Sequence, residues 1–346
     1  MLDILNIVQL VNLGLIAVTM APPPLITLEE HFFSTSVGSN PNTNKAYVEQ
    51  FKHVPGLESK LKNLSDLRLR DMDAGKVSFQ VISHGPTPGA PSPQQCVEAN
   101  DELAAAVANN KTRFAGFAVL PMAHPEESAQ ELERCVKKHK FVGALIDNHV
   151  LGKYYDGPEY RTFWQKAHDL NVAIYIHPTW PSDDMAPRYS GNFTDGASRS
   201  LSASGWGWHT DTGLHFLRLF ASGLFDEMPK LKVIVGHFGE MLPFMFERIG
   251  VLSRRWGEIK RDFAAVYKEN LWITTSGVWG LAPMATILMN TSIEHVLYSV
   301  DYPFAKNEDG LDWIEKLETS GMVTREQLEL IAYKNAEHLL GVKAPK

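Results

Sequence analysis

The sequence Leu25-Ile-Thr-Leu-Glu-Glu-His-Phe-Phe33 begins as a run typical of a buried β-strand and then becomes charged. Side chains alternate between the two faces of a strand, so Glu29 and His31 lie on one face and Glu30 on the other. A carboxylate and an imidazole two residues apart on one face can hold a divalent metal ion. The alternative is a strand that ends in a polar turn, because charged side chains are rarely buried. Taken alone, this stretch favours the polar turn.

The composition is that of an ordinary globular protein with enough apolar material for a large core. The chain has 346 residues, of which 44% are hydrophobic and 21% are charged, and this length suits a single α/β barrel. A net charge of −7 argues against nucleic acid as a partner, because phosphate binding needs clustered Lys and Arg. Cys96 and Cys135 lie in helix-like stretches and indicate reduced thiols rather than a disulfide framework or a zinc cluster.

Residues 1–24 precede the first strand and are interpreted as an appendage, either an amphipathic helix or a mis-started segment. They are mostly apolar, but Asp3, Asn6, Gln9 and Asn12 interrupt them and no basic residue stands at the start. This pattern is a poor match to a signal peptide or to a membrane span. We therefore expect a cytoplasmic protein with no stable membrane span. We expect residues 25–346 to form a single barrel domain.

Seven further strand-like runs follow the first, and helical runs separate them. The strands are expected at residues 77–82, 114–120, 142–146, 172–176, 231–235, 272–275 and 295–300. The helices are expected at residues 61–75, 95–109, 126–138, 160–170, 215–224, 242–256, 284–289, 311–318 and 325–340. Apolar strands alternating with helices indicate a parallel sheet covered by helices. Eight repeats favour a (β/α)8 TIM barrel with extra C-terminal helices, and a doubly wound open sheet is the alternative.

Two polar segments are expected to be loops, at residues 40–51 and 179–204. The second is rich in Ser, Gly, Asp and Pro. Loops of this length in a compact domain are usually functional or disordered, so a lid over a site is a plausible role.

Polar residues recur at the C-terminal ends of the predicted strands. They are Glu29 and His31 on the first strand, His177 on the fifth, His237 on the sixth and Asp301 on the eighth. In a barrel these ends surround one mouth, which is where active sites are found. Each residue alone has a structural explanation, such as a satisfied core histidine or a helix cap. Their joint placement favours an active site, provided that the fold is a barrel.

Eight segments, in order along the chain, match one known family. They are Leu-Glu-Glu-His-Phe at residues 28–32, Phe-Ala-Val-Leu-Pro at 117–121, Phe-Val-Gly-Ala-Leu at 141–145, Tyr-Ile-His-Pro at 175–178, Ala-Ser-Gly-Leu-Phe-Asp at 221–226, Val-Gly-His-Phe-Gly-Glu at 235–240, Thr-Thr-Ser-Gly at 274–277 and Ser-Val-Asp-Tyr-Pro-Phe at 299–304. From about residue 25 to the last helix, the chain resembles the amidohydrolase-related decarboxylases. The resemblance is closest to the γ-resorcylate and 2,3-dihydroxybenzoate decarboxylase group.

The resemblance implies an amidohydrolase-like barrel that binds one divalent metal ion per chain and no organic cofactor. Its metal ligands would be Glu29, His31, His177 and Asp301. Manganese or zinc is expected, with magnesium as a third option. Many relatives begin with His-x-His, whereas this chain has Glu-Glu-His, and a carboxylate in place of an imidazole favours manganese or magnesium over zinc. No lysine stands out as suited to a bridging carbamate, so a second metal is not expected.

The function implied by the resemblance is non-oxidative decarboxylation of an ortho-hydroxybenzoate to a phenol and CO2, a carbon–carbon lyase reaction. Salicylate, a methylsalicylate and the dihydroxybenzoates all satisfy the pattern. Asp301 would deliver a proton to the ring carbon, while His237 and Glu240, as a hydrogen-bonded pair, would set its protonation. Whether Asp301 is a metal ligand, the proton donor or both stays open.

Three aromatic residues are candidate walls for a flat substrate ring. By resemblance, Trp208 and Phe304 fall where the family places its aromatic contacts. Trp180 lies close to the candidate site in the sequence, and ordinary barrel packing is the alternative for it.

Two other functions remain open. A metal-dependent hydrolase of an ester, lactone or amide would use the same ligand types, and it would consume water instead of releasing CO2. A catalytically inactive barrel that serves as a binding protein would contain no stoichiometric metal. The resemblance also implies a homo-oligomer, either a dimer or a tetramer.

Overall fold

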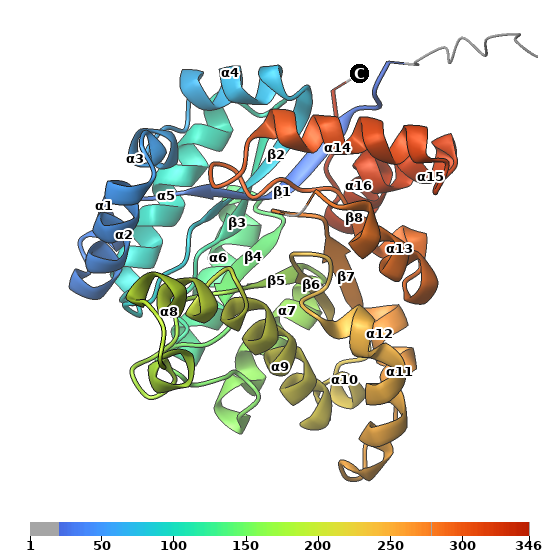
Figure 1. Ribbon diagram of the computed structural model, residues 1–346. Coiled ribbons are helices and arrows are strands. Elements are labelled where there is room, and N and C mark those ends of the chain that lie inside the picture. The colour runs from blue at the N-terminus through green and yellow to red at the C-terminus, as the bar shows by residue number, and fades with distance from the viewer. Residues whose placement is uncertain (1–20, 278, 346) are drawn as a thin grey trace, which may run out of the picture.

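The computed structural model describes residues 21–277 and 279–345. The predicted appendage at residues 1–24 therefore lies mostly outside the described residues. Within them, eight parallel strands form one sheet in which the spatial order equals the chain order (Figure 1). The strands are β1 (Leu25–Phe32), β2 (Val77–His84), β3 (Phe114–Ala118), β4 (Gly143–Asp147), β5 (Ala173–His177), β6 (Lys232–Val235), β7 (Leu271–Thr274) and β8 (Val296–Leu297).

This strand order confirms the predicted barrel and excludes the doubly wound sheet. A doubly wound sheet reverses its strand order at a switch point, whereas here each strand pairs with the next, from β1 to β8. Between the last strand and the first, Glu30 and Tyr302 form a parallel bridge, in which the His31 amide donates to the Tyr302 carbonyl at 2.6 Å.

The side chain of Glu30 completes the seam between β1 and β8. Its carboxylate accepts hydrogen bonds from the amides of Val300 and Tyr302, at 3.0 and 3.1 Å, and from the Ser299 hydroxyl at 3.0 Å. As predicted from strand alternation, Glu30 points away from the face that carries Glu29 and His31. Burial raises the pKa of Glu30 to about 8, although these donors oppose the rise.

Helices surround the barrel (Figure 1). Those in the first half of the chain are α1 (Thr35–Gly38), α2 (Pro41–His53), α3 (Leu57–Leu61), α4 (Asp66–Ala74), α5 (Pro93–Asn109), α6 (Pro125–Arg134) and α7 (Arg161–Leu170). The others are α8 (Asp195–Ser202), α9 (Gly207–Ala221), α10 (Leu224–Glu227), α11 (Leu242–Leu252), α12 (Phe263–Asn270), α13 (Leu281–Asn290), α14 (Asn307–Ser320), α15 (Arg325–Glu329) and α16 (Asn335–Leu340). The predicted terminal helix at residues 311–318 lies within α14, and the one predicted at residues 325–340 is divided between α15 and α16.

The apolar core has two layers. A barrel-interior cluster takes buried side chains from every strand except β7, among them Ile26, Phe117 and Tyr175. The partly buried Trp272 of β7 packs against it, and α16 packs onto it through Leu339. A larger cluster fills the space between the sheet and the surrounding helices. These layers hold the strand ends in fixed positions around the mouth of the barrel.

The structure corrects several helix predictions. Residues 40–51, expected to be a loop, form α2, because Asn40 caps the amides of Asn42 and Thr43 and Pro41 occupies the first turn, a strong helix-start signal. The helix expected at 61–75 is divided into α3 and α4. The helix expected at 215–224 begins earlier, at Gly207, because its first turns are polar and hide the apolar periodicity.

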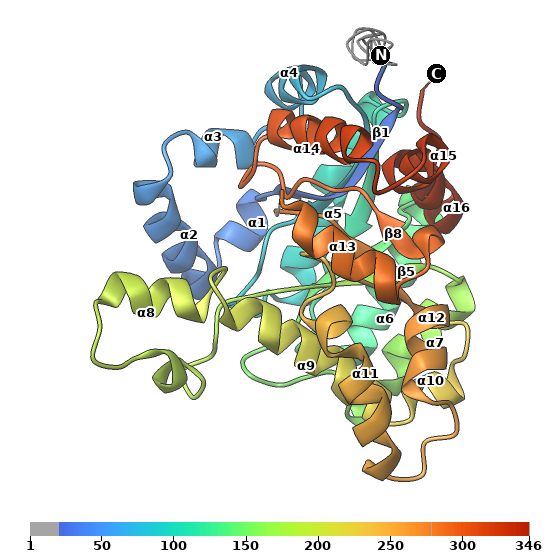
Figure 2. The same ribbon diagram turned by 45° about the vertical axis from the view of Figure 1, so that its right-hand side comes forward.

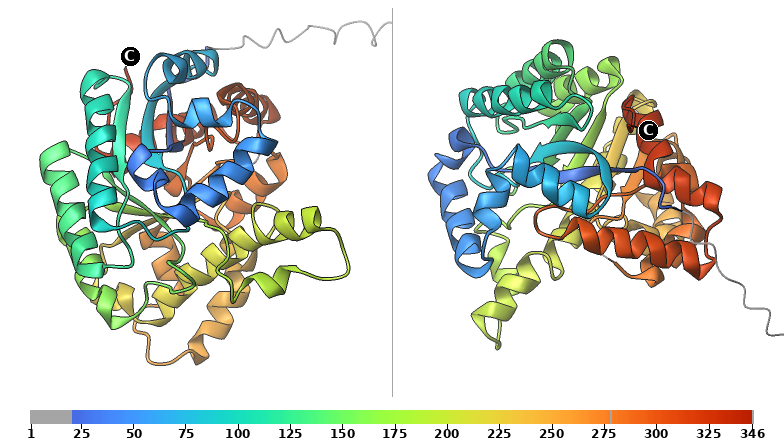
Figure 3. Two further views of the ribbon diagram at one scale, coloured as in Figure 1. Left: turned by 90° about the vertical axis from the view of Figure 1, so that its left-hand side faces the viewer. Right: turned by 90° about the horizontal axis from the view of Figure 1, so that it is seen from above.

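The long segment between β5 and α9, residues 179–206, is here called the arm. It contains α8, whose first turn Thr194 caps, so it is not wholly a loop as predicted. The arm stands out from the barrel in Figure 2, and both views of Figure 3 agree. No helix among the described residues has the length and apolarity that a membrane crossing requires.

Candidate metal centre

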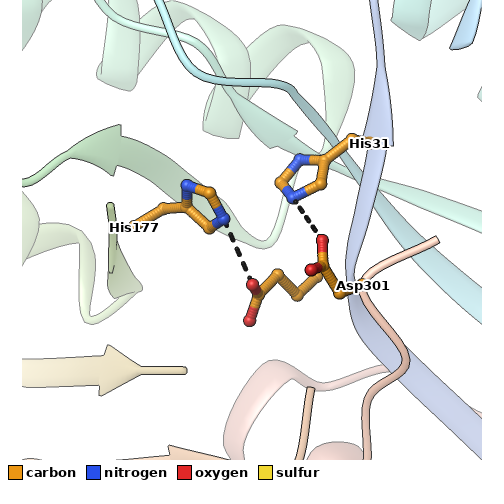
Figure 4. A group of neighbouring side chains, drawn as sticks. His31, His177 and Asp301 are labelled. Atoms are coloured by element: carbon orange, nitrogen blue, oxygen red, sulfur yellow. Dashed lines mark ion pairs between the residues drawn. The ribbon is translucent and has the colours of Figure 1, made fainter. Parts of the chain in front are cut away.

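Four of the polar residues predicted to meet at the barrel mouth converge on one point. Glu29, His31, His177 and Asp301 each offer one ligand atom, and these atoms all lie within 4.8 Å of one another. Nε2 of His31 lies 3.3 Å from Oδ1 of Asp301, and Nε2 of His177 lies 3.2 Å from Oε1 of Glu29. Figure 4 shows His31 and His177 pointing toward carboxylates from opposite sides.

Strand geometry explains this convergence. Glu29 and His31 leave the same face of β1, His177 is the last residue of β5, and Asp301 follows β8. Asp301 has a φ of +71°, a left-handed conformation that few residues other than glycine adopt. Its carbonyl accepts hydrogen bonds from the amides of Phe304 and Ala305, at 2.9 and 3.0 Å, which fix this turn.

One oxygen of Glu29 is held by the protein, and the other faces the centre. Oε2 accepts hydrogen bonds from the hydroxyls of Tyr175, Ser276 and Thr274. A Cβ at Gly236 would lie 2.8 Å from Oε2, so glycine leaves the room that this carboxylate needs. Burial alone would raise the pKa of Glu29, but His237 and His177 hold it well below its ordinary value.

His31 and His177 are oriented by hydrogen bonds at their second ring nitrogens, Nδ1. Nδ1 of His177 lies 2.7 Å from the Pro178 carbonyl, to which it can only donate. Nδ1 of His31 lies 3.3 Å from the Ser83 hydroxyl. The first bond fixes the tautomer of His177 and leaves its Nε2 with a free lone pair, and the Ser83 hydroxyl orients the ring of His31.

The donor atoms fit a divalent cation. Oε1 of Glu29, Nε2 of His31 and Oδ1 of Asp301 are buried, and none of the three has a hydrogen-bond partner among the described residues. Buried polar atoms without partners are rare because they are costly. One cation would satisfy all three atoms, and two carboxylates with two imidazoles suit manganese or zinc.

His237 and Glu240 form a hydrogen-bonded pair beside the four ligand atoms. Nδ1 of His237 lies 2.7 Å from Oε1 of Glu240, while its Nε2 lies 3.4 Å from Glu29 and 4.0 Å from Asp301. Burial alone would lower the pKa of His237, but the carboxylates of Glu29 and Glu240 hold it well above its ordinary value. The pair therefore places an ionisable imidazole next to Asp301.

The three predicted aromatic residues occupy two places. The Phe304 ring lies 5.7 Å from the His31 ring, and Phe304 is 37% exposed. Trp180 and Trp208 pack edge to face at 5.5 Å, and Trp180 also contacts Tyr47. The indole N–H of Trp208 is buried without a hydrogen-bond partner among the described residues.

Sequence reasoning missed several polar residues at the mouth. Asp147 ends β4 in register with His177, so it belongs to the same ring of strand ends. Its carboxylate accepts from the Thr87 amide at 2.7 Å and from the Thr87 hydroxyl at 3.1 Å, and burial raises its pKa to about 6. It also lines a pocket with His149. Its position at a strand end was the available signal. His209, which contacts Glu240, carried no such signal.

Comparisons with known proteins agree on one family. The family model described as amidohydrolase matches residues 61–342. Decarboxylase orsB of Emericella nidulans is 52% identical over 329 residues, which cover 94% of this chain and 99% of that protein. Gamma-resorcylate decarboxylase of Polaromonas sp. strain JS666 is 34% identical, and the match covers 91% of this chain and 97% of that protein.

A solved structure shares the fold over most of both chains. Dihydroxybenzoic acid decarboxylase from Polaromonas sp. JS666 superimposes with a TM-score of 0.82 at 33% identity, covering 92% of this chain and 97% of that chain. That protein was crystallised with bound manganese and the inhibitor 2-nitroresorcinol.

Proposed function

The chain belongs to the amidohydrolase family, and we propose that within it the chain catalyses metal-dependent, non-oxidative decarboxylation of an ortho-hydroxybenzoate. The observation that carries the proposal is the group of unpartnered donor atoms from Glu29, His31 and Asp301 beside the His237–Glu240 pair. The similar proteins named as decarboxylases, at 52% and 34% identity, favour a carbon–carbon lyase over a hydrolase. Salicylate, a methylsalicylate and a dihydroxybenzoate are the candidate substrates.

We assign the metal to Glu29, His31, His177 and Asp301. When bound, a divalent metal supplies a Lewis acid that orients the carboxylate and the neighbouring phenol oxygen of the substrate. Manganese is the first candidate, because two carboxylate ligands favour a harder ion and the solved relative from Polaromonas carries manganese. Zinc and magnesium remain alternatives, and we propose that no organic cofactor takes part.

The reaction needs one proton for each CO2 released. A proton first adds to the ring carbon that bears the carboxylate, and a ring π pair forms the new C–H bond. The electron pair of the breaking bond to the carboxylate then returns to the ring as CO2 leaves. The hydroxybenzoate anion and one proton thus give a phenol and CO2. Aromaticity is lost when the ring carbon is protonated and regained when CO2 leaves.

We propose that Asp301 both binds the metal and delivers this proton. Its Oδ1 faces His31, while Oδ2 faces His237 at 4.0 Å. The two oxygens can therefore serve the two roles separately. His237 and Glu240 would return a proton to Asp301 after each turnover.

The ring itself would lie against aromatic side chains. We propose that Phe304, beside His31, forms one wall, and that Trp208 and Trp180 form another. The unpartnered indole N–H of Trp208 could donate to a substrate oxygen. Flat apolar walls also exclude water from the developing charge.

We further propose that the enzyme is a cytoplasmic homo-oligomer. Cys96 and Cys135 are both free and buried, as is usual where thiols stay reduced. On neighbouring helices, Phe244 of α11 is 74% exposed and Met289 of α13 is 84% exposed, and such apolar side chains often mark subunit interfaces. The molar mass from light scattering would test the oligomeric state.

Replacement of Asp301 tests the mechanism most sharply. With saturating manganese, we expect Asp301→Ala to lower turnover far more than tenfold on any substrate that the unmodified enzyme decarboxylates, as measured by CO2 release. Asp156→Asn, which changes a carboxylate paired with Arg218, should keep normal turnover. If Asp301→Ala keeps turnover within about tenfold, a barrier change of only ~1.4 kcal/mol, Asp301 does not donate the proton.

A further inference from the structure

A contact between α9 and Glu240 joins the catalytic pair to the arm. Nδ1 of His209 lies 2.8 Å from Oε2 of Glu240, so each oxygen of this buried carboxylate meets one imidazole, that of His209 or that of His237. The other nitrogen of His209, Nε2, lies 2.9 Å from the carbonyl of Ser204 in the arm. His209 is therefore held at both ring nitrogens, between the arm and the catalytic pair.

A glycine one turn further along α9 brings the helix against the same residue. A Cβ at Gly213 would lie 2.4 Å from the carbonyl oxygen of Glu240, so only glycine permits this approach. His209 and Gly213 are four residues apart and share one face of the helix. The face that they form, here called the docking face, contacts Glu240 through both its side chain and its backbone.

The backbone that carries the catalytic pair needs such support. His237, Phe238, Gly239, Glu240 and Met241 all have positive φ, between +48° and +90°. Four of these five residues are not glycine, and left-handed conformations of such residues persist only where surrounding contacts enforce them. The contacts of the docking face supply part of that enforcement.

We propose that His209 is a positioning residue of the decarboxylase. It holds the Glu240 carboxylate so that His237 points at Asp301, and it couples this geometry to the seating of the arm. The inference rests on the proposed function, because a positioned pair matters only if the site moves a proton. His209 acts through Glu240 and through His237, whose ring lies 4.7 Å from its own.

His209, His237 and Glu240 could also be viewed as ligands of a second metal ion, because one atom from each lies within 4.8 Å of the others. The nitrogen–oxygen distances of 2.7 and 2.8 Å around Glu240 are those of direct hydrogen bonds. Direct bonds of this kind leave no room for an ion between the groups. Metal content therefore separates the two interpretations.

The test compares His209→Ala, His209→Asn and Gly213→Ala with a matched surface control. His53→Ala removes a histidine that is bonded to Glu49 on the exposed side of α2. For each variant, kcat, KM and metal content are measured on the best ortho-hydroxybenzoate substrate of the unmodified enzyme. In parallel, proton NMR follows the downfield imidazole N–H signals of the manganese-free protein, so that one readout does not depend on turnover.

We expect His209→Ala to lower kcat by about tenfold to a hundredfold, with KM changed less than about threefold. His209→Asn should recover most of kcat, because its amide can donate from the position of Nδ1. Gly213→Ala should lower kcat as well, since its methyl group would displace Glu240. The NMR signal of His237 should shift in His209→Ala and Gly213→Ala, and His53→Ala should match the unmodified enzyme in every readout.

Three results would overturn the inference. One is a kcat in His209→Ala within about twofold of normal. Another is an equal fall in kcat in His209→Asn and His209→Ala, which would mean that the ring contributes packing and not a hydrogen bond. The last is the loss of one of two bound metal ions in His209→Ala. Failure of the proposed function would give a different result. The unmodified protein would release no CO2, while the NMR signal of His237 would still shift in His209→Ala.

Discussion

Tyr175 shows how a single residue outside the ligand set can control the candidate centre. It lies inside the barrel, two residues before His177 on the same face of β5, and its hydroxyl donates to Oε2 of Glu29. Burial and the Glu29 carboxylate together raise the pKa of Tyr175 well above its ordinary value, so the hydroxyl stays a donor. It leaves Oε1 of Glu29 facing the candidate metal site.

We expect Tyr175→Phe to weaken metal binding by about tenfold to a hundredfold, the usual effect of removing a hydrogen bond to a metal ligand. Titration of the metal-free protein with manganese against a competing chelator measures this affinity. Tyr298→Phe is the control, because Tyr298 is also fully buried and its hydroxyl has no partner among the described residues. Equal affinities in the two variants would mean that Tyr175 does not orient Glu29.

Strand β1 contributes to both the candidate metal site and the closure of the barrel through two adjacent residues. Glu29 faces the metal cluster, and Glu30, on the other face, joins β1 to the turn after β8 through Val300 and Tyr302. The seam depends on a side chain because the described residues contain no regular ladder between these two strands. The closure of the barrel and the candidate metal centre therefore depend on adjacent residues of one strand.

Glu30→Gln should lower the free energy of unfolding by about 1–3 kcal/mol, because an amide NH2 cannot accept from a backbone N–H. A carboxyl oxygen can accept this bond even where the raised pKa of Glu30 keeps the group protonated. Urea unfolding of the metal-free protein measures the change. Glu49→Gln, at an exposed site on α2, should leave stability unchanged. An unaltered free energy in Glu30→Gln would show that the seam does not need this carboxylate.

The sequence predicts a strand or helix correctly where its local hydrophobic pattern matches the way in which that element packs in the fold. All eight strands could be located, because strands buried on both faces are apolar throughout. The polar helix α2 was missed, although Asn40 and Pro41 signalled its start. The first turns of α9 were missed because Asp211 and Thr212 are buried polar residues and interrupt the apolar periodicity.

Across the whole molecule, buried neutral histidines make stability depend on pH. Burial lowers the pKa of His84 to about 4 and that of His215 to about 3. In the unfolded chain both would titrate near 6.5. Between these values the unfolded state binds more protons than the folded state does. The contribution of these two histidines to the free energy of unfolding is therefore complete above about pH 6.5 and is lost as the pH falls below 6.5.

For His84 alone, the loss between pH 7 and pH 5 should be about 2 kcal/mol. It is measured as a difference: the free energy of unfolding of the unmodified protein minus that of His84→Asn, at each pH. The subtraction removes the contributions of His215 and Glu30, which both proteins share. A difference that stays constant from pH 7 to pH 5 would contradict the buried neutral state of His84.

The candidate site was only partly accessible from the sequence. Glu29, His31, His177, His237 and Asp301 could be grouped because barrel topology brings strand ends together, whatever the loops do. Asp147 occupies an equivalent position but was passed over, because it precedes Asn148 in an apparently ordinary turn. His209 reaches Glu240 only through the packing of α9, and no spacing along the chain encodes that contact.

The central claim is that one metal at Glu29, His31, His177 and Asp301 serves a decarboxylase. The most direct test is metal content and CO2 release on one sample, offered a panel of salicylate, methylsalicylates and dihydroxybenzoates, beside a His31→Ala variant. We predict about one metal ion per chain and CO2 from at least one acid, with both lost in the variant. Absence of bound metal after addition of manganese or zinc would contradict the metal centre, and bound metal without CO2 from any acid would contradict the decarboxylase.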